Sequence, residues 1–232
     1  MSPSRPATAA IVLAAGAGRR LGADEPKGFL AIGGRPILSV AAAAAAASEA
    51  IDEVIVAVPA GLEDRTAGYL EGIDVPWRVV RGGDSRRASV RAALAALGDE
   101  VVLVAVHDAA RPFAPPDLFT SVLQAIDDDA EGAVPVTPVA DTVKRVRAGF
   151  ITATLPRDEL ALAQTPQAFR LSALRDAHER AAVAGLDVTD DAQAMEAAGY
   201  RVRAIAGDPR NTKITTMLDL VMADTRMGGA DA

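Results

Sequence analysis

The sequence predicts an α/β fold: a Rossmann-like, mostly parallel sheet flanked by helices, with a protruding β-hairpin arm. Short apolar runs rich in β-branched residues alternate with helical segments along the 232 residues, which is typical of parallel strands joined by crossover helices. Half of the residues are hydrophobic but only 3% are aromatic, so small aliphatic side chains must build the core. We expect a single domain over residues 1–232, in which 138–160 form the arm.

Glycine, proline or a polar turn ends each strand that we predict in the first half of the chain. The run 9–15 contains Ile11 and Val12 and stops at Gly16, which suits a buried strand followed by a sharp turn. After a Gly-Gly turn, Pro36 opens an alanine-rich helix. On the same reasoning we expect further strands at 54–58, 77–80 and 101–106, and helices at 36–50, 62–70 and 89–97.

The second half begins with a short strand and the arm. Two polar, β-prone runs flank the turn 147–150, which indicates a hairpin. Residues 164–169 resemble a tight linker into a helix, and Thr189, Asp190 and Asp191 are typical caps for another helix. We expect strands at 133–136, 141–146, 151–155 and 201–206, and helices at 171–185, 192–199 and 217–225.

Composition excludes several classes of function. A net charge of −7 argues against binding nucleic acid or an anionic membrane surface, both of which need a basic face. The chain has no cysteine, so disulfides, thiol nucleophiles and cysteine metal sites are impossible, and two histidines are too few for a histidine metal cluster. The apolar N-terminal run is too short and too glycine-rich for a signal peptide or membrane helix. We therefore expect a cytoplasmic protein.

The loop after the first strand carries the chemistry of a polyphosphate site. Glycines 16, 18 and 22 free backbone N–H groups for a close approach to phosphate, and Arg19, Arg20 and Lys27 add positive charge. The spacing is neither the dinucleotide fingerprint nor a Walker P-loop, so a nicotinamide cofactor is disfavoured. The chain also has only three lysines, Lys27, Lys144 and Lys213, among 24 basic residues; we expect functional roles at 27 and 213 and a solvated strand position at 144.

Polar side chains follow two further strands of the predicted sheet. Ligands bind beyond the carboxyl ends of parallel strands, so Asp84, Ser89, Asp108 and Arg111 should join the first loop there. Asp108 suits Mg²⁺, or another divalent cation, whose remaining ligands are phosphates and water. Simpler explanations stay open: helix capping for Asp84 and Ser89, and a salt bridge to Arg111 for Asp108. His107 is better explained as a packed strand-end residue than as a base.

The predicted arm is polar and cationic, with Thr142, Lys144, Arg145 and Arg157 along it. A lone two-stranded hairpin is marginal in water, so it should pack on a partner. We therefore expect a homodimer formed through the arm.

Strings along nearly the whole chain resemble one family. They are L-A-A-G-x-G-x-R-x-G with P-K, G-G-D-S-R-R-A-S-V (82–90), V-H-D-A-A-R-P (106–112), P-V-x-D-T-V-K-R (138–145), Q-T-P-Q-x-F (164–169), T-D-D (189–191) and N-T-K-I-T (211–215). Together they are similar to the 2-C-methyl-D-erythritol 4-phosphate cytidylyltransferases, whose fold is of the nucleotide-diphospho-sugar transferase type. The resemblance implies transfer of CMP from CTP to methylerythritol phosphate with release of pyrophosphate, in non-mevalonate isoprenoid synthesis.

The resemblance also implies roles for individual residues. Arg20 and Lys27 would stabilise the transition state, while Lys213 and Arg157 would position the acceptor phosphate. The nucleotide would be held by Ala14, Ala15, Gly16, Gly18, Gly83, Asp84, Ser89, Asp108 and Ala109, with Asp108 also meeting the metal. The acceptor would be bound by Arg111, Thr142, Arg157, Thr165, Thr189, Asp190, Lys213 and Thr215, with Thr142 and Arg157 reaching it from the partner's arm.

One residue departs from the family pattern, which usually reads P-K-Q. Here Gly28 follows Lys27, which removes an amide and frees the backbone beside that lysine. Gly28 is the best support for one alternative, a catalytically silent nucleotide-binding regulator. A ribitol-5-phosphate or arabinitol-phosphate cytidylyltransferase also stays open, because those enzymes share nearly every motif and differ in a few pocket residues.

Overall fold

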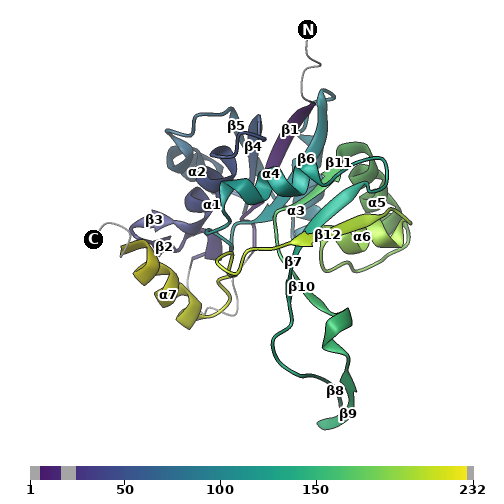
Figure 1. Ribbon diagram of the computed structural model, residues 1–232. Helices are drawn as coiled ribbons and strands as arrows, with labels where there is room; N and C mark the ends of the chain where they lie inside the picture. The colour runs from purple at the N-terminus through teal and green to yellow at the C-terminus, as the bar shows by residue number, and fades with distance from the viewer. Residues whose placement is uncertain (1–5, 17–24, 229–232) are drawn as a thin grey trace.

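An eight-stranded sheet runs through the computed structural model, which describes residues 6–16 and 25–228 (Figure 1). The strand order is β10-β7-β11-β6-β1-β4-β5. The eighth strand, β12, lies off this path and pairs in parallel with β7. The strands are β1 (Ala7–Leu13), β4 (Glu53–Val58), β5 (Trp77–Arg81), β6 (Val101–Asp108), β7 (Gly132–Pro138), β10 (Ala161–Ala163), β11 (Gln167–Arg170) and β12 (Val202–Ala206).

The parallel heart of the sheet is as the sequence predicts. β1 pairs in parallel with β4 and β6, and β4 pairs in parallel with β5. β1, β4 and β6 are mostly apolar because both of their faces are covered, whereas β5 at the edge of the sheet carries two arginines and is only partly buried. Residues 164–169, predicted as a linker, instead lead from β10 into β11, which run antiparallel to β7 and β6. That prediction was wrong because Pro166 interrupts two strands too short to show a period.

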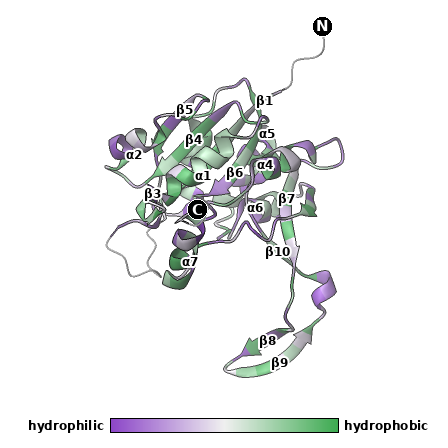
Figure 2. Cartoon of the chain, turned by 60° about the vertical axis from the view of Figure 1, so that its left-hand side comes forward, coloured by the Kyte–Doolittle hydropathy of each residue, from purple (hydrophilic) through white to green (hydrophobic). Residues whose placement is uncertain are grey.

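Helices cover both faces of the sheet and make two main apolar clusters. Ala10 and Val12 of β1 face one cluster, and Ala9 and Ile11 face the other, because side chains alternate across a strand. The first cluster includes α1 (Ile37–Ala46), α2 (Glu63–Leu70) and α4 (Pro116–Gln124); the second includes α3 (Arg86–Ala95), α5 (Leu171–Val183) and α6 (Asp191–Ala197). Figure 2 shows hydrophobic residues concentrated in the central strands and in α1 beside them.

Helix α4 was not predicted from the sequence. Its buried residues Leu118, Phe119, Val122 and Leu123 recur at helical spacing, and Pro116 opens its first turn. The helical period of these four residues is the signal that could have found it.

The C-terminal helix α7 (Met217–Gly228) packs on a small two-stranded ribbon, β2 (Ala31–Ile32) and β3 (Arg35–Pro36). Gly33 and Gly34 form the predicted turn of this ribbon with positive φ angles of 55° and 72°. The N–H of Gly33 donates to Asp224 of α7 over 2.8 Å. A third apolar cluster, which includes Ile32 and Ile214, seals the contact and fixes the segment that leads into α7.

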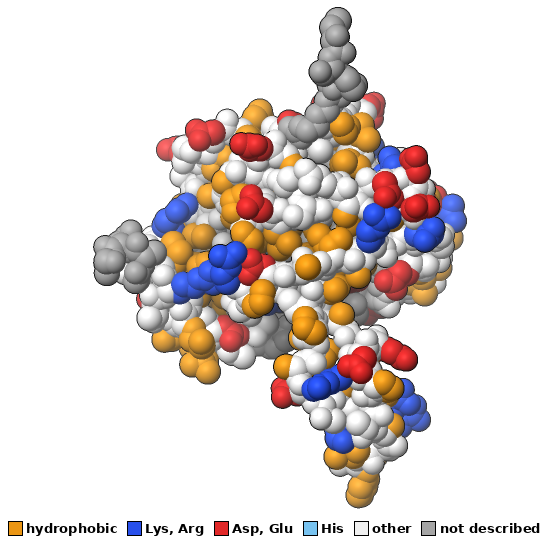
Figure 3. All heavy atoms as spheres, viewed as in Figure 1, with side chains coloured by type: hydrophobic (Ala, Val, Ile, Leu, Met, Phe, Trp, Pro, Cys, Tyr) orange, Lys and Arg blue, Asp and Glu red, His pale blue; other side chains and the backbone are white. Residues whose placement is uncertain are grey.

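The arm projects away from the sheet (Figures 1 and 2). β8 (Val143–Arg147) and β9 (Phe150–Leu155) pair only with each other in the described sheets, which confirms the predicted hairpin. Phe150 and Ile151 are 75% and 66% exposed. Figure 3 shows hydrophobic side chains gathered at the end of the arm.

None of the helices in the described ranges is both long enough and apolar enough to cross a membrane.

Candidate active site

A pocket of about 750 Å³ lies at the carboxyl ends of the parallel strands. It is lined by the loops after β1, β4 and β5, the start of α3, the end of β6, and the stretch before α7. The predicted site residues that it brings together are Ala14, Ala15, Gly16, Lys27, Gly83, Asp84, Ser89, Asp108, Ala109, Lys213 and Thr215. Gly18 and Arg20 lie outside the described residues.

Lys27 sits in a short 3-10 turn, η2 (Lys27–Phe29), at one side of the pocket. Its ammonium donates a hydrogen bond to the carbonyl of Ile214, next to Lys213. The following Gly28 packs against the opening loop, where a Cβ would lie 3.0 Å from the Cβ of Ala14. The missing side chain therefore lets the lysine turn approach the end of β1 closely.

The loop after β5 is closed by Ser89. This serine is 2% exposed; its hydroxyl accepts a hydrogen bond from the N–H of Gly83 and lies 3.0 Å from the carbonyl of Ser85. The helix cap is Ser85 itself, whose hydroxyl accepts from the N–H of Ala88. The alternative that Asp84 and Ser89 are helix caps was therefore wrong: Ser89 shapes the loop, and Asp84 lines the pocket.

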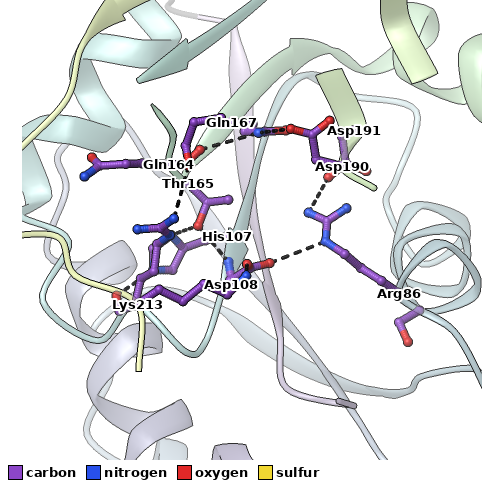
Figure 4. A network of polar contacts seen from close by, with 12 residues as sticks. Arg86, His107, Asp108, Gln164, Thr165, Gln167, Asp190, Asp191 and Lys213 are labelled. Carbon is purple, nitrogen blue, oxygen red and sulfur yellow. Dashed lines mark hydrogen bonds and ion pairs between the residues drawn. The ribbon is translucent and has the colours of Figure 1, made fainter. Parts of the chain in front are cut away.

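Asp108 ends β6 between two cations (Figure 4). Its Oδ2 lies 2.6 Å from Nζ of Lys213, and its Oδ1 lies 3.4 Å from Nε of Arg86. Burial on its own would raise the pKa of Asp108, but the charges of Arg86 and Lys213 outweigh burial and hold the pKa well below its usual range. The alternative of a salt bridge to Arg111 was wrong, because Arg111 donates instead to the carbonyls of Asn211 and Ala163.

His107 and Thr165 lie behind Asp108 and hold its backbone. The hydroxyl of Thr165 accepts from the N–H of Asp108 over 3.0 Å and lies 3.1 Å from Nδ1 of His107. Burial lowers the pKa of His107 to about 4, so its ring is neutral at pH 7. Nδ1 then accepts the proton of Thr165, and Nε2 donates to the carbonyl of Arg111. His107 is a packed strand-end residue, as predicted.

Six predicted acceptor-binding residues do not line this pocket. Thr165 lies behind it, and Asp190 caps α6 by accepting from the N–H of Gln193 over 2.9 Å, with Thr189 beside it. Arg111 lines a second hollow of about 670 Å³, which shares Lys213 with the first. Thr142 and Arg157 are exposed on and beside the arm, where Arg157 donates to the carbonyl of Ala140 over 2.7 Å.

Arg86 lines the pocket and was missed by the sequence reasoning. It joins Asp108 to Asp191 of α6, which is fully buried. Its signal was its place in the first turn of a helix that begins with two arginines, where a cation opposes the helix dipole. That signal is weak, because Arg87 in the same turn donates to the carbonyl of Leu186 instead.

Comparisons with known proteins agree over the length of the chain. The family model described as 2-C-methyl-D-erythritol 4-phosphate cytidylyltransferase matches residues 8–228. A protein of that name from Frankia casuarinae is 44% identical over 227 residues, covering 97% of this chain and 83% of that protein. Another, from Rhodococcus opacus, is 44% identical over 224 residues and covers 96% of each chain. The crystal structure of 4-diphosphocytidyl-2C-methyl-D-erythritol synthase from Anaerococcus prevotii aligns with a TM-score of 0.84 at 31% identity, covering 96% of this chain and 98% of that one.

Proposed function

The chain belongs to the 2-C-methyl-D-erythritol 4-phosphate cytidylyltransferase family, and from that premise we propose how its residues carry out the reaction. The enzyme transfers CMP from CTP to 2-C-methyl-D-erythritol 4-phosphate and releases pyrophosphate, a step of the non-mevalonate route to isoprenoid precursors. An oxygen of the acceptor phosphate bonds to the α-phosphorus of CTP while the bond from that phosphorus to the pyrophosphate oxygen breaks. The nucleophile is already ionised at neutral pH, so the protein need not supply a base.

The proposal rests on one observation: the same pocket is lined by Lys27, Lys213 and Asp108. Phosphoryl-type transfer is accelerated mainly by positioning and by charge stabilisation around the reacting phosphorus. In our proposal Lys27, together with Arg20, stabilises charge on the α-phosphate and the leaving pyrophosphate. Lys213 orients the acceptor phosphate, and Arg157 joins it from the partner's arm.

The two glycine-containing loops are proposed to hold the cytidine. Ala15 of the opening loop lies against Gly82 of the second loop, where an added Cβ would come within 2.6 Å of the Cβ of Ala15. Because the backbones of the two loops lie this close together, they form one continuous wall of the pocket, which is suited to packing against the flat cytosine base. Gly83, Ser89 and Asp84 line the same wall and offer backbone and side-chain polar groups to it.

Asp108 is the residue that we propose to hold Mg²⁺. Within the described ranges no group of three or more histidine or acidic side chains could form a metal cage. The pocket offers the Asp108 carboxylate, and an ion bound to it would take its other ligands from phosphates and water. Such an ion would share the carboxylate with Lys213, whose Nζ lies 2.6 Å from Oδ2. When bound, such an ion would neutralise part of the triphosphate charge.

We also propose a cytoplasmic homodimer formed through the arm. The exposed Phe150 and Ile151, together with Val146 (58% exposed), give the hairpin apolar surface that another chain can bury. Thr142 and Arg157 do not line the pocket of their own chain and are exposed on the arm, so we propose that the arm of a partner brings them to the acceptor. A chain without cysteine needs no oxidising compartment for disulfides, which is compatible with the cytoplasm.

Pyrophosphate release tests the proposal. The purified protein is incubated with CTP, Mg²⁺ and either methylerythritol phosphate or ribitol 5-phosphate, and pyrophosphate is measured by a coupled assay. We expect turnover with CTP and methylerythritol phosphate, weaker use of other nucleotides, and little turnover with the pentitol phosphate. Preference for ribitol 5-phosphate would assign the pentitol alternative, and CTP binding without pyrophosphate release would indicate a silent nucleotide binder.

A further inference from the structure

A line of alternating charges runs from the pocket into the helical layer behind it. We call Asp108, Arg86 and Asp191 the Arg86 bridge. Nε of Arg86 lies 3.4 Å from Oδ1 of Asp108, and its Nη2 lies 2.7 Å from Oδ2 of Asp191. The other oxygen of Asp191 lies 2.9 Å from Nε2 of His178 on α5. One guanidinium thus joins the end of β6 to the start of α6 (Figure 4).

The far end of the bridge is placed where it cannot meet substrate. Asp191 is 0% exposed, His178 is 2% exposed, and neither lines the pocket. Burial would raise the pKa of Asp191, but the neighbouring charge of Arg86 and the hydrogen bond from His178 keep it lowered, so the carboxylate is ionised. Desolvation makes a buried carboxylate of this kind unfavourable, and apolar substitutes of similar volume are often as stable or more so.

The presence of Arg86 is not explained by the stability of helix α3 either. Arg86 is the first residue of α3, and no acidic residue lies in that first turn. A cation there opposes the helix dipole and weakens the helix. The side chain is only 28% exposed, so it does not lie in solvent like an ordinary surface arginine.

What the bridge does fix is the orientation of Asp108. Arg86 takes Oδ1 and leaves Oδ2 toward Lys213 and the pocket. Without a partner on Oδ1, the carboxylate could rotate, and Lys213 would lose a fixed acceptor. The planar guanidinium can hold two carboxylates at once, which a lysine ammonium at the same position does less well.

We infer that Arg86 is a positioning residue for the transfer reaction: anchored by buried Asp191, it sets the orientation of Asp108 and thereby of Lys213. This inference rests on the proposed function of the same pocket. It assigns to Asp191, a residue with no access to substrate, an effect on turnover. The competing role for Arg86 is direct binding of the CTP phosphates, and the two roles differ in what Asp191 does.

The test compares Asp191→Asn and Arg86→Lys with Arg175→Lys. Arg175 is the matched control, because it also ties the α3 region to α5, through the carbonyls of Leu94 and Leu97, and does not line the pocket. For each variant, kcat, the KM values for CTP and acceptor, thermal stability and CTP affinity by calorimetry are measured. The Nε–H signal of Arg86 in ¹⁵N NMR reports the bridge without any turnover.

We expect Asp191→Asn and Arg86→Lys each to lower kcat by about tenfold to a hundredfold, as misplacement of a reacting group does, with CTP affinity within about threefold of wild type. The variant that carries both Asp191→Asn and Arg86→Lys should have a kcat little lower than either single variant, because both substitutions break the same Arg86 bridge. Arg175→Lys should lose stability to a similar degree and keep its kcat. In Asp191→Asn the Arg86 Nε–H signal should shift and exchange faster with water.

Other outcomes overturn the inference. A kcat of Asp191→Asn equal to that of Arg175→Lys would make the bridge purely structural. Arg86 would instead be a ligand of the CTP phosphates if Arg86→Lys bound CTP weakly while Asp191→Asn kept normal CTP binding and turnover. If Asp191→Asn fails to fold, Arg86→Lys and Asp191→Glu decide the matter through the same split between kcat and CTP affinity. Should the wild type release no pyrophosphate, the proposed function fails, whereas an Arg86 Nε–H signal unchanged in Asp191→Asn refutes the bridge by itself.

Discussion

The ammonium of Lys27 donates a hydrogen bond to the carbonyl of Ile214, a residue 187 positions further along the chain. Because Lys213 precedes that carbonyl, the contact brings the loop after β1 and the segment before α7 to the same pocket. Two of the three lysines of the chain thus lie beside one set of strand ends. Helix α7 and the β2–β3 ribbon hold this arrangement from behind through the cluster around Ile32 and Ile214.

Gly82→Ala should disturb the nucleotide wall. The added methyl would lie 2.6 Å from the Cβ of Ala15 and 2.9 Å from Oγ of Ser89, so both loops must move apart. We expect a loss of about 1–3 kcal/mol in the free energy of unfolding, as in other overpacked sites, and a higher KM for CTP.

The matched control for that change is Gly68→Ala, in helix α2, where an added methyl meets nothing within 4 Å. It should raise stability by up to about 1 kcal/mol and leave the KM for CTP unchanged. Denaturant unfolding and steady-state kinetics measure both effects. A KM for CTP that is the same in the two variants would mean that the contact of the loops does not shape the site.

The stability of the protein should fall as pH drops from about 6.5 toward about 4, because of His107. Its pKa is near 6.5 when unfolded and is lowered to about 4 by burial in the fold, so the unfolded chain binds the proton more readily. Protonation therefore favours unfolding throughout that window. Between pH 8 and pH 5 we expect this group alone to remove about 2 kcal/mol of unfolding free energy.

His107→Asn isolates that contribution, since asparagine can still accept the Thr165 proton and does not titrate. Unfolding by urea is measured for both proteins from pH 8 to pH 5 without metal or nucleotide. The wild-type curve should fall more steeply than that of the variant. Parallel curves would show that folding does not lower the pKa of His107.

Mixing two inactive variants should restore activity if the arm acts across a dimer. Arg157→Ala and Lys27→Met each disable every site of their own homodimer. In a mixed dimer, one site combines the intact Lys27 of one chain with the intact Arg157 of the other. With random pairing, about a quarter of the wild-type sites are regained, as expected for a symmetric dimer.

The control is a mixture in which both chains carry Lys27→Met, which should stay inactive. Light scattering establishes the oligomeric state, and Phe150→Asp on the exposed end of the arm should shift it toward monomer. Absence of any recovered activity in a confirmed mixed dimer would place Arg157 and Lys27 in the same chain's site, or remove Arg157 from the reaction.

The sequence predicted the parts of the fold that depend on local pattern. The apolar run around Ile11 and Val12 and the turn at Ala148 and Gly149 were found because their signals lie within a few residues. β10 and β11 escaped because strands of three and four residues around a proline show no period. The pairing of Arg86 with Asp191 spans 105 positions, and only the packing of α6 against the sheet brings the two together.

The candidate site was predictable to the extent that strand ends meet at one edge of a sheet. That rule places Asp108 with the two glycine loops, where the pocket has them. It does not say which cations pair with Asp108: the alternative of Arg111, which is close in sequence, was wrong, and the partners are Arg86 and Lys213. Side-chain partners depend on loop geometry that sequence spacing does not encode.

Replacement of each of the three lysines by methionine tests most directly whether converging cations drive the reaction. Lys27→Met and Lys213→Met remove ammonium groups from the pocket, whereas Lys144→Met removes one from the exposed arm, where it bonds Thr154. Single-turnover rates with saturating CTP and acceptor are compared. We predict losses of about 10²-fold or more for Lys27→Met and Lys213→Met, and a near-normal rate for Lys144→Met. A Lys27→Met rate equal to that of Lys144→Met would contradict the account.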